Sequence, residues 1–195
     1  MTTRTLALAL ALALLIYASS TRAAEPASAA DAAKSYASQF KDRQGAKAIE
    51  TYWDFDAIFA GMFGDNMKAM TPAETAEMRD LALKLFTTIL ASPEVSEIMS
   101  KATFDDFKEH AAGQDRTAVD FTVSSLGKTI PNTLIFEHGK SGWKVVDAGN
   151  SGKMFVAQFK TLYERGVKAG KIKLPVDMFR MVAQSLSAEA KKETK

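Results

Sequence analysis

The chain has 195 residues, with 25 Lys and Arg against 23 Asp and Glu, and it contains no cysteine. A disulfide framework and a cysteine-ligated zinc site are therefore excluded. Without the two arginines of the first 23 residues, Arg4 and Arg22, the balance is 25 − 2 = 23 basic against 23 acidic residues. A chain without net charge is poorly suited to nucleic acid, because that binding requires clustered Lys and Arg.

The first 23 residues have the order of a secretory signal peptide. Arg4 supplies positive charge, an apolar run of 13 residues follows from Leu6 to Ala18, and small residues come next. The run is shorter than the roughly 20 residues that span a bilayer as a helix. We predict that residues 1–23 are removed on export to the periplasm and that residues 24–195 form one domain. An uncleaved membrane anchor is the alternative.

Helical spacing of apolar residues follows in the first half of the domain. Asp54 can cap a helix, because its carboxylate accepts from the free amides of a first turn. Thr71, Pro72 and Glu74 form a typical helix start, with a cap, a proline at the first helical position and a reciprocal acid. Helices are expected over residues 30–44, 47–53, 54–63, 71–91 and 92–99, with a turn at 64–66.

The spacing changes to strict alternation after about residue 100, as in Val119-Asp120-Phe121-Thr122-Val123. Short turns between such segments indicate an antiparallel sheet. In the first of them, the adjacent acids Asp105 and Asp106 are expected on opposite faces. Strands are expected over residues 103–110, 117–126, 129–138 and 142–148, with Trp143 against the sheet, and helices over 155–170 and 174–186.

Residues that carry chemistry are scarce. His110 and His138 are the two histidines, and neither has partners at the spacing of a metal site. Ser151 lies in Gly-Asn-Ser-Gly, which lacks the pattern of a nucleophile elbow. A phosphate loop and a dinucleotide fingerprint are also missing. We therefore expect no catalytic residue, no metal, no cofactor and no enzyme activity.

Soft apolar side chains are abundant instead. The chain has 12 Phe and 9 Met, and the segment from Phe55 to Met70 holds three of each. Methionine adapts its shape to irregular apolar neighbours. Ordinary core is the alternative for each single residue, whereas the set is compatible with a pocket for an apolar ligand.

The order of several segments resembles that of the toluene-tolerance family, which includes the MlaC-type periplasmic phospholipid shuttles. The stretches that carry the resemblance are Trp53–Ile58, Phe63-Gly64, Met70–Glu74, Gly142–Asp147, and Ser151 with Phe155 and Phe159.

The resemblance implies an α+β fold, with helices packed on a curved four-stranded antiparallel sheet that encloses an apolar cavity. It implies phospholipid as the ligand, and as partners an inner-membrane lipid transporter complex and an outer-membrane lipoprotein complex. The expected lining residues are Phe59, Met62, Phe63, Leu85, Phe121, Val123, Leu134, Phe136, Val145, Phe155 and Phe159.

Two other interpretations stay open. One is a small-molecule-binding or enzymatic domain with a cone-shaped pocket, in which a buried Asp120 or Asp147 would act as acid or base. The other is an envelope scaffold without a ligand.

Overall fold

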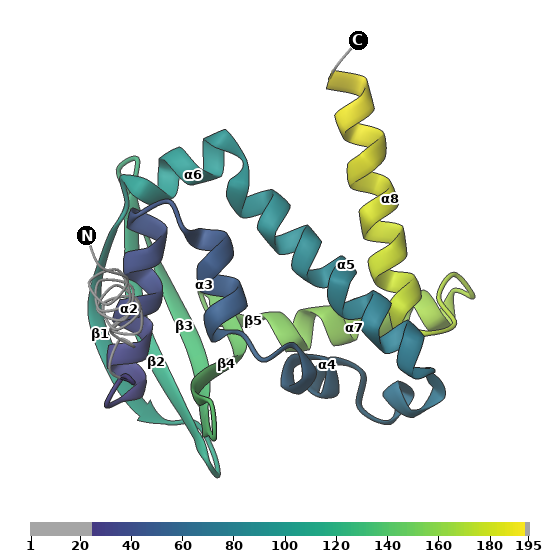
Figure 1. Cartoon of the computed structure of the whole chain (residues 1–195), viewed down its shortest axis with the longest axis horizontal. Helices are drawn as coiled ribbons and strands as arrows, with labels where there is room; N and C mark the ends of the chain where they lie inside the picture. Colours follow the sequence, from purple (N-terminus) through teal and green to yellow (C-terminus); the bar gives the residue numbers. More distant parts are fainter. Residues whose placement is uncertain (1–24, 194–195) are drawn as a thin grey trace, which may run out of the picture.

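In a computed structural model of the chain, residues 25–193 are described, and they form an α+β fold (Figure 1). The predicted signal peptide, residues 1–23, and its cleavage site lie outside these residues. The elements are α2 (Ala29–Lys41), α3 (Gly45–Tyr52), α4 (Phe55–Phe63), the 3₁₀ helix η1 (Gly64–Ala69), α5 (Pro72–Ala91), α6 (Pro93–Ser100), β1 (Thr103–Ala111), β2 (Arg116–Ser125), β3 (Lys128–Gly139), β4 (Gly142–Asn150), β5 (Lys153–Met154), α7 (Phe155–Lys168) and α8 (Pro175–Glu193).

The sheet is an open antiparallel meander in the order β1-β2-β3-β4-β5. It has five strands, and the expectation of four was wrong because β5 is too short for alternation to appear in the sequence. Gly149 on β4 pairs with Met154 on β5. A Cβ at Gly149 would lie 2.7 Å from the carbonyl oxygen of Lys153, so glycine permits this close pairing.

Strand β1 departs from regular alternation. Its register with β2 shifts between Asp105 and Lys108, and Asp106 has φ +60°. The expectation that the two adjacent acids lie on opposite faces of a regular strand fails at this bulge. Because of the extra residue, Phe104 and Phe107 both stack on Phe121, with ring centroids 6.4 and 5.2 Å away.

Helix starts follow the expected caps. Asp54 accepts from the amide of Ala57, and Thr71 and Glu74 form a reciprocal capping box. Gly64, with φ +52°, ends α4. The segment expected as a turn after it is the 3₁₀ helix η1.

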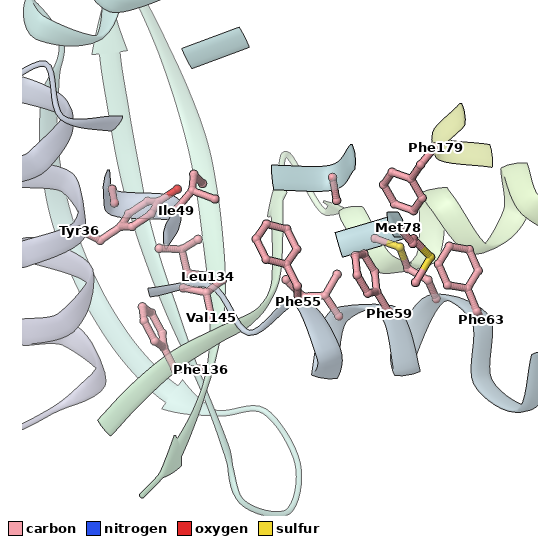
Figure 2. Packing of buried hydrophobic residues seen from close by; sticks show 14 of the residues in the cluster. Tyr36, Ile49, Phe55, Phe59, Phe63, Met78, Leu134, Phe136, Val145 and Phe179 are labelled. Carbon is pink, nitrogen blue, oxygen red and sulfur yellow. The ribbon is translucent and has the colours of Figure 1, made fainter. Parts of the chain in front are cut away.

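The buried apolar side chains lie in two regions (Figure 2). Helices α2 and α3 cover the sheet, and between them lies the sheet core, which includes Tyr36, Ile49, Leu134, Phe136 and Val145. Helices α4, α5, α7 and α8 enclose the helical core, which includes Phe59, Phe63, Met78 and Phe179. Phe55 lies between the two regions (Figure 2).

Candidate functional site

An open pocket of about 280 Å³ lies between α2, α6, the sheet and the start of α7. We call it the sheet pocket. Its apolar walls come from helices α2 and α6, from strands β1 to β4 and from the first residue of α7. These apolar lining residues are Tyr36, Phe40, Met99, Phe104, Phe121, Val123, Leu134, Ala148 and Phe155.

Strand register assembles the floor of the sheet pocket. Phe121 and Val123 alternate on β2, so both side chains point to the same face. Leu134 pairs with Val119, and Asn132 pairs with Phe121, which places β3 directly beside them. The alternation that the sequence shows therefore becomes a continuous apolar surface under α2.

The rim of the sheet pocket is polar. Asn132, Asn150, Lys153 and Gln158 line it, and Lys153 supplies a cationic side chain. The Gln158 side-chain amide donates to the carbonyl of Lys153 at 3.1 Å. A pocket with apolar walls and a polar, partly cationic rim can hold an apolar chain inside and an anionic group at its mouth.

An aromatic array continues from the sheet pocket toward the helical core. Phe155 contacts Phe86, Phe159 and Trp53, with centroids 5.5, 4.2 and 6.1 Å away. The indole N–H of Trp53 is buried beside the phenol of Tyr36 and forms no hydrogen bond of good geometry with residues 25–193. Burial raises the pKa of the Tyr36 phenol well above the ordinary value, and the neighbouring Trp53 lowers it in part. The array thus contains one buried donor whose hydrogen bond is not well formed.

The structure does not bring the predicted lining residues together in one place. Phe121, Val123, Leu134 and Phe155 line the sheet pocket. The others do not line it. Phe136 and Val145 are fully buried in the sheet core, Phe59, Met62 and Phe63 are buried in the helical core, Phe159 packs on Phe155, and Leu85 is half-buried on α5.

Several lining residues have no counterpart in the sequence prediction. Tyr36 and Phe40 come from α2, Met99 from α6 and Phe104 from β1. The spacing of four between Tyr36 and Phe40 on an alanine-rich helix is a signal that could have identified the first two. Phe104 faces the pocket because it pairs directly with Val123 on β2, and this register is not visible in the sequence of β1 alone.

The acids considered for acid–base chemistry have structural partners. Asp147 is half-buried, and burial raises the pKa of its carboxyl group. Its carboxylate accepts from the backbone amides of Ala148 at 2.8 Å and Val156 at 3.0 Å, so it holds the start of α7. Asp120 is exposed and lies between His110 and Thr133, at 3.1 and 2.6 Å. In this arrangement the histidine faces no nucleophile.

Metal-binding clusters of three or more His, Cys, Asp or Glu residues do not occur in the described part of the chain. His138 is exposed and lies 3.1 Å from Glu25. Within residues 25–193, no helix is long and apolar enough to cross a bilayer.

A second hollow, the hairpin groove, is larger than the sheet pocket. It lies between α2, the end of α3 and the loop that joins β3 to β4. It has a volume of about 1060 Å³, and Trp143, Tyr52, Lys34, Lys140 and Lys144 are among its lining residues. Trp143 is half-buried and packs edge-on against His138, with ring centroids 4.8 Å apart. The groove lies at the end of the β3–β4 hairpin.

The fold is similar to that of a phospholipid-binding protein from Ralstonia solanacearum, solved in complex with a phospholipid. The two chains have 18% sequence identity and a TM-score of 0.59, over 82% of this chain and 94% of that chain. No family model matches the sequence, and no curated protein matches it. At this level of identity the likeness concerns the fold, an α+β arrangement of helices on an open antiparallel sheet.

Proposed function

We propose that the protein binds a phospholipid, with an acyl chain in the sheet pocket and the head group at its polar rim. The observation that carries the proposal is the division of the pocket into aromatic walls and a rim that holds Lys153. The similarity in fold to a protein solved with a bound phospholipid supports the same function.

The binding energy would come mainly from the acyl chain. Each methylene removed from water contributes about 0.8 kcal/mol, so a chain of ordinary length needs no deep polar anchor. The ammonium of Lys153 would attract the phosphate, and the side-chain amides of Asn132 and Gln158 would donate to its oxygens. Inside the protein, the buried indole N–H of Trp53 would donate to an ester carbonyl.

A second acyl chain needs more room than the sheet pocket provides. Its volume of about 280 Å³ lies just below the range of about 300–1,000 Å³ that is usual for ligand pockets. Phe86, Phe155 and Phe159 are half-buried side chains between the pocket and the helical core. We infer that these rings turn aside when the second chain enters.

The proposed role is that of a periplasmic carrier. It would take lipid between an outer-membrane lipoprotein complex and an inner-membrane transporter complex, with no chemical change to the lipid. The basic, apolar and small-residue order of residues 1–23 and the family resemblance support this part of the proposal.

The first test is extraction of natively purified protein with organic solvent, followed by mass spectrometry of the extract. We expect phospholipid at close to one molecule per chain. Val123→Trp should reduce the bound lipid severalfold, because the indole fills the pocket. The melting temperature of the lipid-free variant should stay close to that of the wild type, since Val123 borders open space.

Val119→Trp is the matched control. Val119 lies on the same strand and the same face but is fully buried and does not line the sheet pocket. Overpacking there should destabilise the fold by about 1–3 kcal/mol. The proposal is wrong if wild-type protein carries no phospholipid, or if Val123→Trp unfolds the protein as Val119→Trp does.

A further inference from the structure

The turn between β2 and β3 contains an exposed leucine in a strained conformation. Leu126 and Gly127 form its centre, with φ +50° and +73°, between the paired residues Ser125 and Lys128. Such turns favour Asn or Asp before Gly, because the side chain of another residue crowds the backbone at positive φ. The Leu126 side chain is 78% exposed. Packing of the fold therefore does not account for leucine here, and a backbone outlier of this kind is a reason to seek a function.

Two isoleucines lie at the same end of the sheet as Leu126, Ile98 beside it and Ile130 further along the hairpin. Ile98 on α6 is 39% exposed, and Ile130 on β3 is 44% exposed. Ile98 and Leu126 border a hollow of about 240 Å³, and the Ser125 hydroxyl donates to the carbonyl of Ile98 at 3.3 Å. We call Ile98, Leu126 and Ile130 the hairpin tip. Figure 1 shows α6 and the β2–β3 turn together at one end of the molecule.

Basic side chains border the hairpin tip. Lys128 is exposed and forms no ion pair with a described residue. Glu97 on α6 is paired with Lys101 four residues later. Lys101, and more weakly Arg43, lower the pKa of the Glu97 carboxyl group. The tip thus joins exposed apolar side chains to the cation of Lys128 and to the ion pair of Lys101 with Glu97.

The hairpin tip is continuous with the sheet pocket. Ile130 pairs directly with Val123, which lines the pocket, so both side chains lie on the same face of the sheet. Met99, the residue after Ile98, also lines the pocket. A partner that binds the hairpin tip would therefore lie next to the sheet pocket.

We propose that the hairpin tip is a docking surface for an anionic lipid bilayer. Leu126 and the two isoleucines would enter the interfacial region, and Lys101 and Lys128 would lie against anionic head groups. A bilayer suits a narrow projecting turn, whereas a stable protein partner usually covers about 800 Å² on each side. Docking would bring the sheet pocket to the membrane surface. The inference adds to the proposed function but does not require lipid in the pocket.

The test is binding to phosphatidylcholine vesicles with and without phosphatidylglycerol. Leu126→Asn removes the apolar side chain and supplies a residue that tolerates positive φ. It should leave the melting temperature equal or higher while weakening vesicle binding about tenfold, which corresponds to about 1.4 kcal/mol. Lys128→Gln should weaken binding to the anionic vesicles alone, by about fivefold.

Leu162→Asn is the matched control, because Leu162 is 53% exposed on α7, away from the tip. It should not change vesicle binding. The variants are compared with one shared N-terminus, established by intact mass, so any contribution from Leu6–Ala18 is common to all. Because the chain has no cysteine, a polarity-sensitive dye on Leu126→Cys reports the tip alone. Its emission should shift to the blue on vesicles, and the same dye on Leu162→Cys should not respond.

Equal losses for Leu126→Asn and Leu162→Asn would overturn the proposal. The proposal would also be overturned if the emission of the dye at position 126 did not shift on vesicles. The same holds if the wild-type protein bound neither kind of vesicle and instead bound a protein through the hairpin tip. Lipid extraction separates the two proposals. If Leu126→Asn retains wild-type phospholipid but all variants bind vesicles equally, the pocket functions and the docking surface does not.

Discussion

Trp53 lies where the sheet core and the helical core meet, and its surroundings combine favourable and unfavourable contacts. Its ring packs against Phe86 at 5.1 Å and Phe155 at 6.1 Å. Its N–H, however, is buried beside the Tyr36 phenol without a hydrogen bond of good geometry among residues 25–193, and a buried donor without any partner costs about 1–3 kcal/mol. A ligand that accepts a hydrogen bond from this nitrogen would recover that free energy.

Replacement of Trp53 by Phe tests the role of the indole nitrogen. Phenylalanine is smaller than tryptophan and loses packing contacts, but the substitution also removes the buried N–H donor. These two effects on stability oppose each other, so we expect the free energy of unfolding of the lipid-free protein to change by less than about 1 kcal/mol. Phospholipid retention should fall severalfold, as measured by mass spectrometry of the extracted protein.

Trp143→Phe is the control for this substitution, because Trp143 lies in the hairpin groove outside the sheet pocket. It should leave lipid retention unchanged. Equal retention in the two variants would show that the Trp53 nitrogen does not contact the ligand.

At the scale of elements, local signals determine where helices begin. The caps at Asp54 and Thr71 appear in the sequence and occur as expected, because a capping side chain satisfies amides within its own first turn. Alternation also identified β2, β3 and β4. The bulge at Asp106 and the pairing of β5 were missed, because both depend on a neighbouring strand.

The candidate site was less predictable than the elements for a related reason. The stripe of Phe59, Met62 and Phe63 was correctly assigned to the apolar face of a helix. The spacing shows which face of the helix is buried, but it does not show which other element that face packs against. In the structure the face packs against Tyr163 of α7 and Phe179 of α8, in the helical core. Only side chains on the sheet itself, such as Phe121, were placed at the pocket by alternation.

The capping box of α5 provides a test at the scale of elements. Thr71→Ala removes the acceptor for the Glu74 amide, which it binds at 3.2 Å. The expected cost is about 1 kcal/mol, or a decrease of about 2–4 °C in the melting temperature by calorimetry.

Thr75→Ala, one turn further along α5, is its control. The Thr75 hydroxyl donates to the carbonyl of Thr71 inside the helix, and alanine is the better helix former. This variant should be neutral or slightly more stable. A loss as large as that of Thr71→Ala would argue that the cap contributes nothing of its own.

At the scale of the whole molecule, the helical core depends on contacts between distant segments. Arg180 on α8 donates to both carboxylate oxygens of Glu77 on α5, at 2.8 and 2.6 Å, and to Asp177 at 3.1 Å. The hydrogen bond from Arg180 lowers the pKa of Glu77, and backbone amides led by that of Leu174 lower the pKa of Asp177. These groups hold the last helix against the middle of the chain.

The lowered pKa values predict an acid-sensitive helical core. A carboxyl group whose pKa is lower in the folded state stabilises the fold above its unfolded pKa, which is about 4. That stability is lost as the pH falls below about 4 and through the folded pKa. The melting temperature should therefore decrease at acid pH, and Glu77→Gln should make the decrease shallower.

Asp65→Asn is the control for the pH series, because Asp65 is 90% exposed in a local pair with Lys68. Its pH profile should follow that of the wild type. If Glu77→Gln also follows the wild type, the pair with Arg180 makes no measurable contribution to acid stability.

The meander order of the sheet also sets a sequence of folding events. Each strand pairs with its neighbour along the chain, so the sheet closes only short loops, whereas α4 must meet α7 and α5 must meet α8 about a hundred residues later. Short loops cost less entropy to close and form sooner. The sheet can therefore assemble before α8 brings Phe179 to the helical core. During that interval Phe59 and Phe63 remain uncovered, which makes this half of the molecule the part that most needs protection from aggregation.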